Sequence, residues 1–89
     1  MNIEFDLTKD AVNQQQHGVS LAAAGLFDFG SALLKADTRK LYGEMRYIAY
    51  GPIGPRLYCL VFTIRGGTLR AISLRKANSR EVRDYEQRT

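Results

Sequence analysis

The chain has 89 residues, of which 45% are hydrophobic and 25% are charged. This length suits a single domain over residues 1–89 with a modest core, and the hydrophobic content excludes a disordered chain, which needs low hydrophobicity and high charge. Lys and Arg (13) exceed Asp and Glu (9), for a net charge of +4. Up to residue 64 the two signs balance at six each, so residues 65–89, with seven basic and three acidic side chains, hold the whole excess.

Composition also excludes some kinds of functional site. His17 and Cys59 are the only His and Cys, so the sequence offers no metal-ligand set and no internal disulfide. Cys59 lies inside an apolar run, which is typical of a buried, inert thiol. We find no secretion signal at the start of the sequence and no apolar run near the roughly 20 residues of a membrane span. We therefore expect a cytoplasmic protein with no bound metal or cofactor.

The first part of the chain predicts helices. A helix over residues 7–16 is weakly amphipathic, with Leu7 and Ala11 on one face. Gly18 ends it, because glycine takes the left-handed conformation at low cost. The other elements expected here are a short edge strand before the helix, a second helix and a strand, at residues 3–5, 21–27 and 31–36.

The second part predicts antiparallel strands. Residues 44–50 alternate as a strand, and the GPIGP sequence at residues 51–55 indicates a turn. Residues 56–64, rich in β-branched and aromatic side chains, form the clearest strand. Gly66-Gly67 predicts a two-residue hairpin that returns the chain as a strand over residues 69–75.

A capped helix closes the chain. It spans residues 79–87, with Asn78 as its N-cap and Glu81 at the spacing of a capping box. The elements together predict an α+β fold, with N-terminal helices and a C-terminal helix around a three- to four-stranded antiparallel sheet.

Basic side chains on adjacent strands indicate a surface that binds polyanions. Strict alternation places Ile72 and Leu74 toward the core, together with Arg70, and turns Arg75 outward. Forked guanidinium donors suit phosphate. The cations expected on this surface are Arg46, Arg70, Arg75, Lys76, Arg80 and Arg83. A solvated basic face that only keeps the protein soluble explains the charge equally well.

Three further side chains are candidates for chemistry or stacking. His17, where the helix dipole favours the protonated form, can transfer a proton near neutral pH, or can simply cap helix carbonyls. Glu81 can act as a general base, although its capping-box position also explains it fully. Tyr85, four residues on, can stack on a base or pack against the sheet.

The chain has an ordered set of short motifs: Phe5-Asp6, His17-Gly18-Val19-Ser20, Arg46, Arg70 to Ala77, Glu81 and Tyr85. This set, which covers nearly the whole chain, resembles the BrnT toxins, ribonucleases of bacterial type II toxin–antitoxin pairs. The resemblance implies a RelE-like fold, RNA cleavage that inhibits translation and growth, and neutralisation by a BrnA-type antitoxin. It also implies that operator DNA is bound only through that antitoxin.

Three positions depart from the family pattern. Gln16 stands where the family tends to have Lys before the His-Gly pair, Leu7 where it often has Pro, and residues 22–24 are all Ala where an acidic residue is usual. The first departure removes a cation beside the expected site. The other two bear on packing or on the antitoxin surface.

Metal-independent RNA cleavage needs a base for the 2′-hydroxyl, cations for the charged phosphorane and an acid for the leaving oxygen. The hypothesis assigns phosphate binding to Arg46, Arg70 and Arg75, long-range attraction to Lys76, proton transfer to His17 or Glu81, and base stacking or phosphate orientation to Tyr85. Two rival hypotheses remain: a basic binding module without catalysis, and a degenerate toxin that still binds its antitoxin, which Gln16 keeps open.

Overall fold

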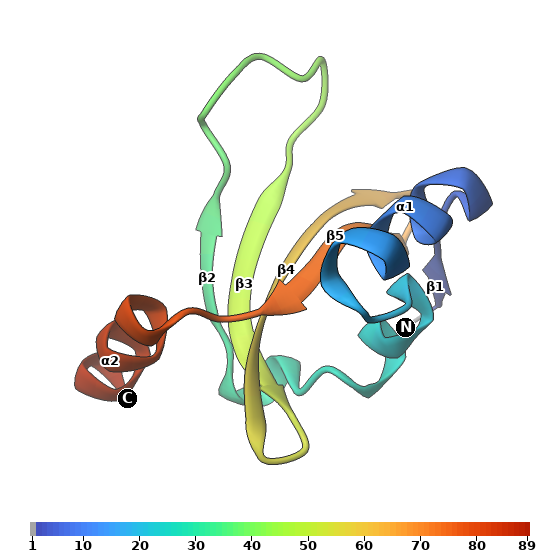
Figure 1. Cartoon of the computed structure of the whole chain (residues 1–89). Helices are drawn as coiled ribbons and strands as arrows, with labels where there is room; N and C mark the ends of the chain where they lie inside the picture. Colours follow the sequence, from blue (N-terminus) through green and yellow to red (C-terminus); the bar gives the residue numbers. More distant parts are fainter. Residues whose placement is uncertain (1) are drawn as a thin grey trace.

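The protein, described at residues 2–89 by a computed structural model, is built on one five-stranded sheet (Figure 1). The strand order is β1-β5-β4-β3-β2, and β2 to β5 form an antiparallel meander to which β1 adds parallel to β5. The strands are β1 (Ile3–Glu4), β2 (Leu33–Ala36), β3 (Tyr47–Ile53), β4 (Arg56–Arg65) and β5 (Thr68–Lys76). The predicted α+β class is confirmed, and the arrangement is consistent with a RelE-like fold. The expected three- to four-stranded antiparallel sheet is wrong in its strand number, because β1 joins the four-stranded meander as a parallel fifth strand.

Two α-helices and two short 3₁₀ helices complete the chain: α1 (Leu7–His17), η1 (Leu21–Leu26), η2 (Phe29–Ser31) and α2 (Ser79–Arg88). Gly18 ends α1 in the left-handed conformation, with φ of 71°. The expected second helix is η1, whose bonds span three residues, such as that from the Ala23 N–H to the Ser20 carbonyl. None of the helices in residues 2–89 combines the length and apolar character needed to cross a bilayer.

The main core lies on one face of the sheet, where η1 packs. Its buried side chains come from η1, the residue after it and the three central strands: Leu21, Ala24, Phe27, Ala49, Leu60, Phe62, Leu69, Ala71 and Leu74. A smaller cluster lies on the opposite face and consists of Ile48, Cys59 and Val61, with Tyr50 and Ile72 packed against it.

The turn after β3 is shorter than expected. The prediction of a turn over residues 51–55 is wrong for residues 51–53, which belong to β3, and the chain turns only at Gly54 and Pro55. A Cβ atom on Gly51 would stand 2.7 Å from Cζ of Phe27. Gly51 is therefore required because the Phe27 ring lies directly against the strand.

The start of β3 is also later than expected, at Tyr47 instead of Glu44. The β3–β4 pairing begins at Tyr47 and Phe62, and before it the Thr63 hydroxyl on β4 donates to the Met45 carbonyl at 2.6 Å. The expected strand over residues 44–46 is therefore instead the end of the β2–β3 connection, held to β4 by a side-chain bond.

A bulge in β5 decides which of its side chains share a face. On β4, Val61 pairs with Ser73 and Phe62 pairs with Ala71, so Ile72 is an extra residue on β5. Such a residue shifts the alternation of the strand by one position. The prediction that Ile72 and Leu74 share the core face is therefore wrong.

The bulge sets the two faces of β5 as follows. Leu74 is fully buried in the main core, whereas Ile72 packs with the small cluster on the opposite face. Arg70 pairs with Thr63 and Arg75 with Cys59, both on the Ile72 side. Arg70 and Arg75 thus share the face away from the main core, although strict alternation predicts opposite faces for them.

Polar side chains attach α1 to the sheet. The predicted apolar face is wrong, because Leu7 is 79% exposed, and the buried residues of the helix are Asp10 and Asn13. Asn13 bonds both backbone groups of Leu74, donating to the carbonyl at 2.8 Å and accepting from the N–H at 3.1 Å. Since β1 pairs only with Leu69 and Arg70, Asn13 satisfies the edge of β5 that β1 leaves open.

We predict that Asn13→Ala lowers the free energy of unfolding by about 2–4 kcal/mol, because it leaves two buried backbone groups of Leu74 without partners. Chemical denaturation measures the change. Gln15→Ala, on the exposed side of the same helix, is the control and should stay within about 0.5 kcal/mol of the parent. Equal effects of the two substitutions would show that Asn13 does not anchor α1.

Candidate nucleic-acid interface

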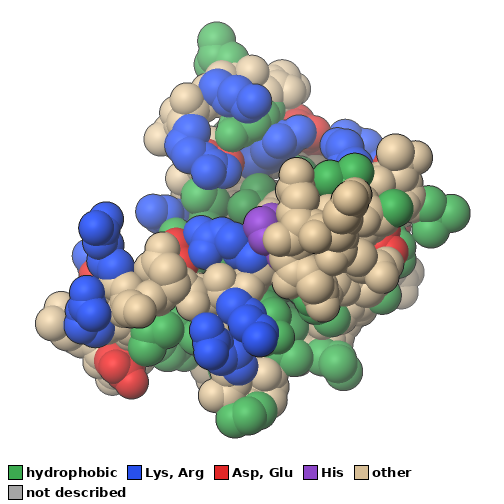
Figure 2. All heavy atoms as spheres, in the orientation of Figure 1, with side chains coloured by type: hydrophobic (Ala, Val, Ile, Leu, Met, Phe, Trp, Pro, Cys, Tyr) green, Lys and Arg blue, Asp and Glu red, His purple; other side chains and the backbone are tan. Residues whose placement is uncertain are grey.

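The face of the sheet opposite the main core presents basic side chains, and we call it the basic face. It is defined by Arg46, Tyr50, Arg70, Ser73 and Arg75. Figure 2 shows Lys and Arg side chains gathered on the side between α2 and α1, with the histidine at the edge of α1. The face exists in this form because the bulge brings Arg70 and Arg75 to one side of β5.

Arg46, Arg70 and Arg75 line the face at two levels. Arg70 pairs with Thr63 of β4 and Arg75 pairs with Cys59, so the two backbone positions are separated by four residues of strand, about 13 Å. Arg46 directly precedes β3 and lies at the Arg70 level, two strands away. Arg46 and Arg70 therefore lie toward one end of the face and Arg75 toward the other, and the backbone does not bring them to one point.

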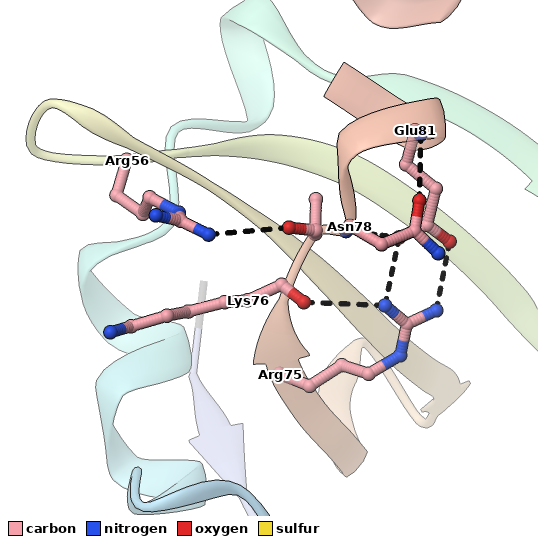
Figure 3. A network of polar contacts seen from close by, with 6 residues as sticks. Arg56, Arg75, Lys76, Asn78 and Glu81 are labelled. Carbon is pink, nitrogen blue, oxygen red and sulfur yellow. Dashed lines mark hydrogen bonds and ion pairs between the residues drawn. The ribbon is translucent and has the colours of Figure 1, made fainter. Parts of the chain in front are cut away.

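Arg75 forms the strongest polar contact of the face. Its Nη1 and Nη2 donate to the two carboxylate oxygens of Glu81, each at 2.8 Å (Figure 3). Glu81 also accepts from the Asn78 N–H at 2.9 Å, while the Asn78 side chain accepts from the Glu81 N–H, so the predicted capping box is confirmed. One carboxylate therefore fixes both the guanidinium of β5 and the start of α2.

The ion pair sets the protonation of both partners. Arg75 is the largest cause that lowers the pKa of Glu81 from its ordinary 4.5 to about 2, and the same contact raises the pKa of Arg75. At neutral pH the Glu81 carboxylate is ionised and has little affinity for a proton. It is therefore a weak general base and well suited to holding a cation in place.

Tyr50 and Cys59 lie beside this pair and were not singled out for the site from the sequence. Burial raises the pKa of Tyr50 to about 12 and also raises the pKa of Cys59, so both groups keep their protons at neutral pH. Cys59 is buried at 3% exposure, as its apolar surroundings predicted. The Lys35 ammonium lies 5.7 Å from the centre of the Tyr50 ring. Only the register of β2, β3 and β4 reveals these neighbours.

His17 lies next to the basic face. It is exposed in the last turn of α1 and lines a hollow of about 200 Å³ together with Gln16, Ile72 and Ser73. Ser73 pairs with Val61, midway between the levels of Arg70 and Arg75. The fold thus brings His17, distant in sequence, to the edge of the basic face, level with the stretch of β5 between Arg70 and Arg75, with Gln16 beside it.

The remaining cations differ in their surroundings. Arg70 has the carboxylate of Glu4 at 3.5 Å, and Arg46 stacks over the Tyr42 ring with its guanidinium carbon 4.1 Å from the ring centre. Arg80 on α2 lines a hollow with Lys35 and Tyr50 and so adds to the face.

Two of the predicted RNA-binding residues point elsewhere. Lys76 extends away from Arg75 and Glu81 (Figure 3), and Arg83 lines a separate hollow on the other side of α2 with Pro55. Tyr85 contributes to the hollows on both sides of α2, and its hydroxyl donates to the Ser31 carbonyl. That bond ties α2 to the segment before β2.

One known protein family matches the part of the chain that holds most of these residues. The family model described as "Ribonuclease toxin, BrnT, of type II toxin-antitoxin system" matches residues 5–81. The chain belongs to the BrnT family. The match includes His17, the three arginines of the basic face and Glu81, and it ends before Tyr85. No curated protein matches the chain. Membership of this toxin family implies RNA as the substrate and a cognate antitoxin as the partner.

We predict that the Arg75–Glu81 pair stabilises this BrnT protein only above acidic pH. Because the folded-state pKa of Glu81 is depressed, its contribution is full above about 4.5 and is lost as the pH falls toward about 2. Glu81→Gln should lower the free energy of unfolding by about 1–2 kcal/mol at neutral pH, since the pair is partly screened by solvent.

Urea unfolding across the pH range measures this difference, which should shrink between pH 4.5 and pH 2. Glu86→Gln, an exposed substitution on the same helix, is the control and should have a small effect that does not depend on pH. A loss for Glu81→Gln that is constant with pH would rule out the ion pair as its source.

Proposed function

We propose that the protein is a metal-independent endoribonuclease that cleaves RNA on the basic face and thereby inhibits translation and growth. The observation that supports this most is the placement of His17 between the levels of Arg70 and Arg75 on one face of the sheet. A proton-transfer group and phosphate-binding cations are the parts that the reaction requires.

In the proposed reaction the RNA backbone lies along the face. His17 takes the proton of a 2′-hydroxyl, the 2′-oxygen attacks the adjacent phosphorus, and the bond from phosphorus to the 5′-oxygen breaks. Water protonates the leaving 5′-oxygen, and the hydroxide that results takes the proton from His17. The upstream product strand ends in a 2′,3′-cyclic phosphate. One of Arg70 and Arg75, which lie on β5 on either side of the level of His17, stabilises the negative charge that develops on the phosphorane, and the other binds a neighbouring phosphate.

Other residues act in supporting roles in this proposal. Glu81 is a positioning residue that fixes the guanidinium of Arg75, because its low pKa makes it a poor base. Arg46 and Arg80 bind neighbouring phosphates, and Lys76 and Arg83 supply long-range attraction from positions off the face. Tyr85 orients α2 through its bond to Ser31, with its ring left to stack on a base.

We further propose that the cognate antitoxin is of the BrnA type and neutralises the toxin in the cytoplasm. In this proposal the complex binds operator DNA only through the antitoxin. Negative charge on the antitoxin would complement the basic face, where the Lys and Arg side chains gather.

Purified protein incubated with RNA at low salt in a chelator tests the activity. We expect cleavage that falls about 10²-fold in His17→Gln, since general acid–base groups typically contribute that much. Arg46→Ala and Arg75→Ala should each reduce it at least tenfold. Arg88→Ala, which removes an exposed cation paired with Asp84 at the far end of α2, is the matched control. Full activity in both arginine variants would remove these residues from the mechanism.

Binding without cleavage is the second candidate. The specific observation behind it is that Glu81 already neutralises Arg75, and Gln16 adds no cation beside His17. Such a protein would bind RNA with an affinity that falls steeply with salt, would leave the RNA intact and would not arrest growth when expressed alone. A degenerate toxin would behave in the same way and would still bind its antitoxin.

A further inference from the structure

We infer that the β2–β3 connection, residues 37–46, is a second RNA-binding element that holds single-stranded RNA beside the cleavage position. The inference deepens the proposed ribonuclease function and rests on it. In Figure 1 this connection extends well beyond the rest of the sheet, at the top of the view. Figure 2 shows Lys and Arg side chains on this extended part as well as at its base.

Asp37 is buried within the connection and forms hydrogen bonds to three of its other residues. Its side chain is fully buried, and its carboxylate accepts from Nε of Arg39 at 2.8 Å, from Nη2 of Arg39 at 2.7 Å and from the Tyr42 hydroxyl at 3.0 Å. The Asp37 N–H donates to the Arg46 carbonyl at 2.8 Å and closes the base. The bonds from Arg39 hold the pKa of Asp37 well below its usual range. The fold therefore gives the Tyr42 ring a defined position.

The charges of the connection are only partly neutralised. Asp37 pairs with Arg39, and Glu44 pairs with Arg65 of β4 at 3.1 Å. Within residues 2–89, Lys40 and Arg46 have no carboxylate within ion-pair distance. The two cations of the connection without a carboxylate partner are thus the two that lie beside Tyr42.

Tyr42 and its cations form the proposed subsite. The guanidinium carbon of Arg46 is 4.1 Å from the ring centre, and the Lys40 ammonium is 5.5 Å from it. Nε of Arg46 is buried without a hydrogen-bond partner among the described residues. An aromatic ring combined with unpaired cations is the arrangement that binds single-stranded nucleic acid, because bases stack on the ring while phosphates contact the cations.

The subsite continues the basic face. Arg46 belongs to both, since it directly precedes β3 and is in phase with Ile48 on that face. An RNA strand that runs from Arg75 past His17 toward Arg46 reaches Tyr42 next. Leu41 at 101% exposure and Met45 at 61% add apolar surface that suits unstacked bases. An acidic protein would need the cations alone and gives no reason for the ring beside them.

A non-cleavable probe tests binding apart from chemistry. The probe is a fluorescent single strand of about 12 nucleotides, long enough for one such groove, with every 2′-hydroxyl methylated so that the nucleophile is blocked. Tyr42→Phe and Tyr42→Leu both lose the hydroxyl bond to Asp37, but only the second loses the ring. Fluorescence anisotropy should show Tyr42→Phe near the parent affinity and Tyr42→Leu weaker by about 5–10-fold.

A charge variant adds a second readout. Lys40→Gln should reduce the slope of log affinity against log salt by about 0.7, the value for one phosphate contact on a single strand. Arg88→Gln removes another exposed cation, outside the connection and paired with Asp84, and should change affinity and slope less than Lys40→Gln does. An effect of Lys40→Gln no larger than that of Arg88→Gln would overturn the inference.

The outcomes separate the inference from the proposed function. If the protein cleaves RNA and Tyr42→Leu binds the probe as tightly as Tyr42→Phe, the inference fails while the proposed function stands. If the protein cleaves no RNA but Tyr42→Leu weakens probe binding as expected, the RNA subsite stands and the proposed function fails. If Tyr42→Leu weakens binding of the purified antitoxin and leaves RNA binding intact, the connection belongs to the antitoxin interface and the inference is overturned.

Discussion

The extra residue in β5 is the constraint on which the candidate site depends. If Ile72 were part of a regular ladder instead of a bulge, strict alternation along the strand would send Arg70 and Arg75 to opposite faces, one of them into the side occupied by the main core. With the bulge, Leu74 remains fully buried while both arginines lie on the open face. The bulge thereby lets one short strand serve a hydrophobic core and a polyanion surface without burying a charge.

The Arg75–Glu81 pair shows how this surface is kept in order. Cations on neighbouring strands of a small sheet repel one another. The Glu81 carboxylate from α2 offsets part of that repulsion and also fixes the guanidinium of Arg75. As a consequence, Arg75 is already paired with Glu81 when a ligand arrives. Within residues 2–89, His17 and Arg46 form no ion pair with a carboxylate, so the groups of the face that are free to contact RNA lie toward α1 and the β2–β3 connection.

Features fixed by local sequence were predictable. The Gly66-Gly67 hairpin, both residues of which have positive φ, and the Asn78–Glu81 capping box follow from residues next to each other in the chain. The bulge at Ile72 was not, because it depends on which β4 residues must be buried opposite it. Tyr50 and Tyr42 could not be predicted as site residues for the same reason, because their roles arise only from strand register and from contacts between distant residues. The composition predicts an excess of cations, but it does not predict that they lie on one face of the sheet.

The way α2 is attached has a dynamic consequence. The helix has no buried residue. It is held to the rest of the protein by the Arg75–Glu81 ion pair, by the hydrogen bond from the Tyr85 hydroxyl to Ser31 and by its covalent link to β5. Breaking those few contacts exposes little apolar surface, so the free energy of opening this helix is far smaller than that of unfolding the sheet. The terminal helix is therefore a separate cooperative unit: it can detach and return many times while the strands beneath it remain paired.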